Sequence, residues 1–176
     1  MDLLEFAKAH GIEVEHSSEK SYSTDDNISY LSSEAGLLEQ IENETPDHVF
    51  KLVPQPYMKN VSNTPEYLTI HYAKGKPTKV ELLGNTFAKK AQKTITGSLN
   101  IMNTLNALGT KHAIGNTDIV ETRVNGLKNH GVYQNPGSAI LYAAHDDMQD
   151  ICLDKEVLKL QYMLSNELSY IAYEGF

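Results

Sequence analysis

Residues 117–141, TDIVETRVNGLKNHGVYQNPGSAIL, limit the fold of this chain more than any other stretch. β-Branched side chains at positions 120, 122 and 124 alternate with Glu121 and Arg123, as along a strand with one solvated face. Asn125-Gly126 is a tight-turn dipeptide and a second short run ends at Tyr133, so the stretch predicts a β-hairpin. Glu121 and Tyr133 lie on its two arms, either on a solvated sheet face or as half of a binding site for a small ligand.

The rest of the chain predicts further hairpins and helices. Residues 137–151 form the clearest helical pattern, with an apolar stripe of Ile140, Leu141, Ala144, Met148 and Ile151. The other predicted elements are a helix over 3–10 stopped by Gly11, a short strand at 11–16, a Ser/Asp/Asn-rich loop with a helical turn over 20–40, a strand at 48–53, a hairpin over 67–83 turning at 74–77, a helix over 98–108 closed by Gly109, and a last helix capped by Asp154 that is able to bury against the hairpins. Without regular βαβ alternation, the predicted fold class is α+β, with hairpins packed against helices.

Composition excludes several classes of protein. A chain of 176 residues, 40% of them hydrophobic, suits one domain with a sizeable core. Its net charge of −8, with no basic cluster longer than Lys89-Lys90, argues against a nucleic-acid partner. No apolar run approaches the roughly 20 residues of a membrane helix. The single cysteine, Cys152, cannot form an internal disulfide, which agrees with a cytoplasmic location, and we expect it to be buried and inert.

The sequence lacks the common nucleotide-binding and metal-binding motifs. No two glycines lie closer than five residues apart, which leaves no Gly-rich dinucleotide or phosphate loop. Gly126 and Gly131 have P-loop spacing, but Val132 stands where the lysine is needed. His145-Asp146-Asp147 are neighbours on a predicted helix and do not converge, so we expect a solvated polar face and no metal site.

Two polar clusters carry a resemblance to a known family. YSTDDNISYLSSEAGLLE is similar to W/Y-S-x-D-x-N-L-x-x-x-S-x-E-x-G-x-L-E of argininosuccinate synthase. DIVETRVNGLKNHGVYQNPGSAIL resembles the hairpin of the same family, approximately D-x-V-E-N-R-x-x-G-x-K-S-R-x-x-Y-E-x-P. Flanking segments agree in order, among them FAKAHGI, SNTPEYLTIHYAKGKPTKV and the C-terminal DKEVLKLQYMLSNELSYIAYEGF. The resemblance spans nearly the whole chain and is weakest at 40–60 and 83–96.

The resemblance implies a function for a longer enzyme. The family is an ATP-dependent carbon–nitrogen ligase of arginine biosynthesis, which joins citrulline and aspartate through a citrullyl-adenylate and releases AMP and pyrophosphate. It implies that residues 1–176 are a single synthetase domain, without the family's N-terminal nucleotide-binding domain and its C-terminal oligomerisation segment. A start in mid-helix and an end directly after a helical pattern agree with a fragment. ATP and magnesium would be held mainly by the nucleotide domain, so we expect no cofactor in this chain alone, which would be inactive. The full-length family is a homo-oligomer, expected to be a tetramer.

Carried over residue by residue, the citrulline contacts fall on Ser23, Ser32, Glu121 and Tyr133. Citrulline is a zwitterion with a polar tail, so an anionic acceptor for its ammonium and hydroxyls for its other ends suit it. Other interpretations stay open: the serines as turn caps, Glu121 as a cross-strand ion-pair partner, and Tyr133 as a packed strand aromatic. The resemblance assigns no catalytic residue within this chain.

The sequence also departs from the family pattern. Asn116 replaces an arginine before the hairpin, Asn129 and His130 stand in the K-S-R segment, and Ile28 replaces a leucine. These departures leave open an atypical family member with altered affinity or assembly. A separate alternative is a non-catalytic metabolite-binding or assembly module that keeps the fold without a nucleotide partner. A small hydrolase using Asp118 and Glu121 is disfavoured, because residues three apart on a strand face opposite sides.

Overall fold

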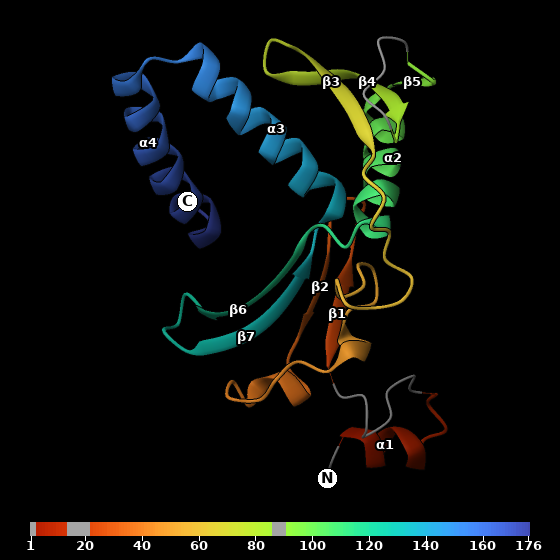
Figure 1. Cartoon of the computed structure of the whole chain (residues 1–176). Coiled ribbons are helices and arrows are strands. Elements are labelled where there is room, and N and C mark those ends of the chain that lie inside the picture. Colours follow the sequence, from red (N-terminus) through yellow and green to blue (C-terminus); the bar gives the residue numbers. More distant parts are fainter. Residues whose placement is uncertain (1–2, 14–21, 86–90) are drawn as a thin grey trace.

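The computed structural model describes residues 3–13, 22–85 and 91–176 of the chain. Two antiparallel sheets and a set of helices make up an α+β fold, as the sequence predicts (Figure 1). The hairpin predicted within residues 117–133 is formed by β6 (Asn116–Thr122) and β7 (Lys128–Gln134), with Asn125-Gly126 in its turn. Gly126 has a φ of 84°, a conformation that glycine adopts without steric cost.

This hairpin forms half of a four-stranded sheet. The order is β1-β2-β7-β6, with β1 (Ser23–Asp26) and β2 (Leu31–Glu34) completing it. One face of the sheet packs on an apolar cluster of Tyr22, Leu38, Val49, Phe50 and Val132. Two 3-10 helices, Gly36–Glu39 and Asp47–Val49, supply Leu38 and Val49 to this cluster. The other face is therefore left to polar side chains.

A second core lies at the opposite end of the molecule. β3 (Tyr67–Ala73), β4 (Lys76–Gly84) and β5 (Lys93–Thr96) form a three-stranded sheet against α2 (Ser98–Lys111) and the first half of α3 (Pro136–Cys152). The cluster is centred on Val80, Ile95, Ile101 and Leu105. Gly109 does not close α2, as we had expected, but lies inside it. A Cβ there would come within 2.6 Å of Pro136 Cβ, so the glycine lets α2 and α3 approach.

The outer helices bury little. α1 (Leu3–Ala9) ends before Gly11, as expected, and α4 (Lys155–Glu174) begins at its predicted cap, Asp154, whose carboxylate accepts from the amides of Glu156 and Val157. The expectation that α4 buries against the hairpins is wrong, because none of its residues is buried. Met148 and Ile151 of the predicted α3 stripe are also exposed. No helix in the described ranges is long and apolar enough to cross a bilayer.

Four local expectations differ from the structure, the last of them within its described part. Part of the predicted loop at 20–40 forms β1 and β2, because β2 finds a partner in β7 that local composition does not reveal. The predicted strand at 48–53 is instead the end of a 3-10 helix and irregular chain, whose Val49, Phe50 and Val53 are buried without strand pairing. Cys152 is exposed at the end of α3, not buried. Of the predicted strand at 11–16, residues 11–13 form none and 14–16 lie outside the described residues.

Candidate functional site

All four residues that the resemblance assigns to citrulline lie on one face of the four-stranded sheet. Ser32 of β2 pairs with Tyr133 of β7, and Ser23 of β1 pairs with Glu34, which is two residues from Ser32 along β2. Since side chains alternate along a strand, these residues and Glu121, which is opposite Asn129 of β7, share the face away from the core. The sheet thus places together residues that are about 100 positions apart in sequence.

Glu121 and Tyr133 contact each other directly on this face. The Tyr133 hydroxyl donates a hydrogen bond to Glu121 Oε1. Burial, and next the bond to the Glu121 carboxylate, raise the pKa of Tyr133 well above its ordinary value, so its hydroxyl remains a donor at neutral pH. From the sequence we expect these two side chains to point to the same side of the hairpin, into a cleft shared with Ser23 and Ser32. The same side is confirmed, but neither serine lines the cavity that the pair faces. Asp118 is on the opposite face, 2.6 Å from His130 Nε2, so it cannot act with Glu121.

A cavity of about 540 Å³ opens beside this pair. Its volume is within the range of about 300–1,000 Å³ that is usual for small-molecule sites. It is lined by Glu34, Glu121, Arg123, Val124, Asn125, Tyr133 and Tyr173. Tyr173 comes from the end of α4, which lies near β6 and β7 in Figure 1. Ser32, which is buried, and Ser23, which is exposed, share the sheet face but do not line this cavity.

Of the two carboxylates that line the cavity, only one has a cationic partner among the described residues. Arg123 Nη2 donates to Glu34 Oε2 and, at 2.8 Å, to Asn129 Oδ1. Asn129 Nδ2 lies 3.3 Å from Glu34 Oε2 and 3.5 Å from Glu121 Oε1. Glu34 therefore has a cationic partner, whereas the Glu121 carboxylate receives only neutral donors within the described residues. A partly buried carboxylate in this state is suited to bind a substrate ammonium group.

Sequence reasoning missed Glu34, Arg123, Asn129 and Tyr173 as parts of the site. Glu34 and Arg123 had a usable signal, because each lies two residues after a predicted site residue and so on the same strand face. Asn129 was accessible from the hairpin register, in which it is opposite Glu121. Tyr173 had no such signal, since its position depends on how α4 is placed over the sheet.

Two of the departures from the family pattern, Asn116 and His130, make structural side-chain contacts in this chain. Asn116 Nδ2 donates to the carbonyls of Val53 and Pro54, and its Oδ1 accepts from Gln134, which ties the 53–54 segment to the sheet. His130 is buried on the core face beside Asp118 and Thr45. The Ile28 side chain is exposed, and its bond from Asn106 of α2 goes to the backbone carbonyl, so this bond does not explain the replacement of leucine. None of these three residues lines the cavity, whereas Asn129, the remaining departure, contacts Glu34 and Glu121 beside it.

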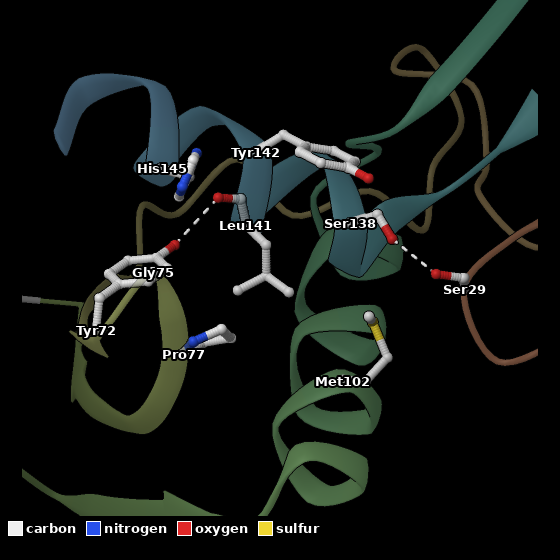
Figure 2. Close-up of a pocket in the computed structure, with 9 residues that line it drawn as sticks. All are labelled: Ser29, Tyr72, Gly75, Pro77, Met102, Ser138, Leu141, Tyr142 and His145. Atoms are coloured by element: carbon white, nitrogen blue, oxygen red, sulfur yellow. Dashed lines mark hydrogen bonds between the residues drawn. The ribbon is translucent and has the colours of Figure 1, made fainter. Parts of the chain in front are cut away.

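A second cavity, of about 310 Å³, lies between the β3–β4 hairpin, α2 and α3 (Figure 2). Tyr72, Pro77, Met102 and Leu141 form much of its wall. The Tyr72 hydroxyl donates to the Leu141 carbonyl at 3.1 Å, and the hydroxyls of Ser29 and Ser138 are 3.1 Å apart (Figure 2). These bonds hold the hairpin and the 27–30 loop against α3, and burial raises the pKa of Tyr72. None of the four predicted citrulline residues lines this cavity. We interpret it as a gap in the packing between the β3–β4 hairpin, α2 and α3.

Neither a glycine-rich phosphate loop in the sequence nor a metal-binding cluster among the described residues is found. The sequence has no closely spaced glycines to form a cradle of backbone donors around phosphates. In the part of the chain that the structure describes, no three His, Cys, Asp or Glu side chains gather in a way that would hold a metal ion. We therefore assign no step at a phosphorus atom to these residues.

Comparison with known proteins identifies the family to which the chain is similar. Residues 22–176 match the family model of the "Arginosuccinate synthase C-terminal domain". The chain is 37% identical over 175 residues to argininosuccinate synthase of Drosophila melanogaster, 36% over 175 residues to that of Homo sapiens, and 39% over 176 residues to that of Schizosaccharomyces pombe. Each alignment covers 99% of this chain and 40% of the relative, so the chain spans about 40% of the length of these relatives. The chain belongs to the argininosuccinate synthase family.

Proposed function

We propose that this chain supplies the citrulline-binding half of an argininosuccinate synthase active site. The observation that carries the proposal is the Glu121 carboxylate, which lines a cavity of about 540 Å³ and is bonded to neutral donors only, within the described residues. Membership in the argininosuccinate synthase family supports the proposal. The reaction that we propose, an ATP-dependent ligation of citrulline and aspartate through an adenylate, is the one implied by the resemblance of the two sequence motifs.

The chemistry of each side chain suits one part of citrulline. Glu121 accepts from the α-ammonium group, a charge-assisted bond that is stronger than a neutral one. The Tyr133 hydroxyl holds the Glu121 carboxylate in place through its own bond. Ser23 and Ser32 lie on the same sheet face outside the cavity, so their hydroxyls would bind the carboxylate or ureido end where citrulline extends over β1 and β2. The role of this chain is then to bind and orient citrulline. The residues that bind ATP and magnesium and stabilise the departing pyrophosphate belong outside residues 1–176.

The proposal is tested by citrulline-dependent exchange of labelled pyrophosphate into ATP. The chain is mixed with the part of the Schizosaccharomyces pombe relative that lies outside the match, and ornithine, which lacks the ureido group, serves as the matched control for citrulline. Exchange with citrulline and not with ornithine is the expected result. Citrulline binding without exchange would instead favour a non-catalytic metabolite-binding module, and neither binding nor exchange would refute the citrulline assignment.

A further inference from the structure

Tyr133 and Glu121 are bonded although they are not opposite each other in the sheet. Tyr133 pairs with Thr117, while Glu121 pairs with Asn129, four residues further along β7. Four residues of strand span about 13 Å, at about 3.3 Å per residue. A tyrosine that stood upright from the sheet would not reach Glu121. Its ring must lie along the strand, across the position between the two pairs.

That intervening position on β7 is Gly131. It pairs with Glu34 on one side and Ile119 on the other, on the same face as Tyr133. An alanine Cβ at Gly131 would lie 2.8 Å from Cε2, 2.9 Å from the hydroxyl oxygen and 3.0 Å from Cζ of Tyr133. The backbone of Gly131 is not left-handed, so conformation does not explain the glycine. The Tyr133 ring occupies the space that a side chain would take.

We propose that Gly131 is a positioning residue for substrate recognition, because the space above it lets the Tyr133 ring lie along β7 and orient the Glu121 carboxylate. This inference rests on the proposed function for the identity of the substrate. The atoms that a Cβ would meet are at the far end of a flexible side chain. Tyr133 also lines a neighbouring hollow of about 390 Å³, together with Thr117 and Asn135. A displaced Tyr133 ring therefore has room to move. Gly131→Ala should leave the fold intact and disturb only the bond between Tyr133 and Glu121.

The first test needs only the chain itself and no ligand. Ionisation of the tyrosine rings is followed by ¹³C NMR in the parent, in Gly131→Ala and, to assign the signal, in Tyr133→Phe. In the parent, Tyr133 stays protonated at a pH where exposed tyrosines, with a pKa of about 10, have begun to ionise. In Gly131→Ala, Tyr133 loses the Glu121 bond and titrates closer to the exposed tyrosines. The melting temperature changes little.

Gly109→Ala is the matched control. Here the added Cβ meets backbone atoms of Pro136, at 2.8 and 2.9 Å, which cannot swing away. We expect this variant to lower the melting temperature more than Gly131→Ala and to leave the Tyr133 titration as in the parent. If Gly131→Ala leaves the titration unchanged, or changes it only together with a loss of stability as large as that of Gly109→Ala, the inference is wrong.

The second test is a double-mutant cycle on citrulline binding in the mixed exchange assay. Gly131→Ala and Tyr133→Phe should each raise the citrulline concentration for half-maximal exchange roughly tenfold, since each removes one hydrogen bond to a charged group. Gly131→Ala should add nothing in the Tyr133→Phe background, because it acts through that hydroxyl. Additive effects would overturn the positioning role. If the parent shows no citrulline-dependent exchange, the proposed function fails, and the ligand-free titration still decides whether Gly131 places Tyr133.

Discussion

At the scale of single residues, the site depends on which of two carboxylates, Glu34 or Glu121, has no cationic partner among the described residues. Glu34 and Glu121 are both on the polar face of the sheet, but Arg123 pairs with Glu34. Asn129 contacts both carboxylates through one neutral amide, so the two acidic groups are held close without a second cation. A lysine or arginine at position 129 would pair with Glu121 and remove its capacity to bind a substrate ammonium.

Replacing Glu121 by glutamine should weaken citrulline far more than ATP in the assembled enzyme. The substitution keeps the shape of the side chain and removes the charge that faces the ammonium, at a cost of about 1.5–3 kcal/mol. This corresponds to roughly one to two decades in affinity. The measurement is the dependence of pyrophosphate exchange on each substrate in turn. Equal losses for citrulline and ATP would contradict the role assigned to Glu121.

The sequence predicted Glu121 and Tyr133 because a hairpin turn fixes the register of its own two strands. Ser23 and Ser32 were found through the family motif alone, since their face is set by pairing between β2 and β7, about 100 residues away in sequence. Cys152 was misjudged for a related reason. Its helical neighbours are apolar, but the last turn of α3 is not covered by another described element, so the side chain is exposed.

At the scale of elements, α4 combines a clear local signal with weak packing. Its start was predicted correctly, because an aspartate cap is a local feature. Its apolar side chains are exposed nonetheless, among them Leu160, Leu164 and Leu168. The apolar periodicity predicted a helix with a face to bury, but periodicity does not specify what covers that face.

Asp154→Ala should therefore melt α4 locally while the rest of the fold remains. Loss of an N-cap costs about 0.5–2 kcal/mol. Because no residue of α4 is buried, little packing energy compensates for this loss. We expect lower helical circular dichroism and faster amide exchange in residues 155–174, with both cores still protected. Asp154→Asn, which keeps the cap oxygen, is the control, and a global loss of exchange protection would show that α4 is coupled to the cores.

The end of α2 is tied to the connection before β3 by a pH-sensitive contact. Lys111 Nζ donates to Glu66 Oε1, and His112 Nε2 lies 3.8 Å from the other carboxylate oxygen. The bond from Lys111 is the main cause of a lowered Glu66 pKa. A carboxyl with a lowered folded-state pKa stabilises the fold above its unfolded-state pKa, and this contribution is lost as the pH falls through the folded-state value.

Lys111→Met should accordingly destabilise the chain at neutral pH and less so in acid. At neutral pH the loss should be under about 1 kcal/mol, because the pair is partly solvated. The difference from the parent should shrink as the pH falls below 4.5, the ordinary value for this carboxyl. Urea unfolding at several pH values measures it, with Glu66→Gln as the background in which the pH dependence disappears. A difference that stays constant from neutral to acidic pH would show that Lys111 acts through packing of its aliphatic stem.

At the scale of the whole molecule, local patterns predicted both tight hairpins and the three long helices, and so the α+β class. They did not predict β1, β2 or β5, or the strand order. β2 is short and polar on one face, and only its pairing with β7 makes it a strand. β5 is likewise short and polar apart from Ile95, which it contributes to the second core. Pairing between distant segments and coverage by other elements are whole-chain properties that a local pattern does not contain.

The last prediction follows from charge and from the distribution of donors over the whole chain. Residues 1–176 alone should fold cooperatively and give no citrulline-dependent pyrophosphate exchange. Folding needs the two apolar clusters, and both are formed by segments of this chain. Adenylation needs preorganised donors around the departing pyrophosphate, and neither the glycine spacing nor the acidic side chains provide them. A net charge of −8 also repels a polyphosphate. Thermal unfolding and the exchange assay on the same sample are the measurement. Exchange by the chain alone would contradict this prediction, because it would show that residues 1–176 themselves bind ATP and stabilise the departing pyrophosphate.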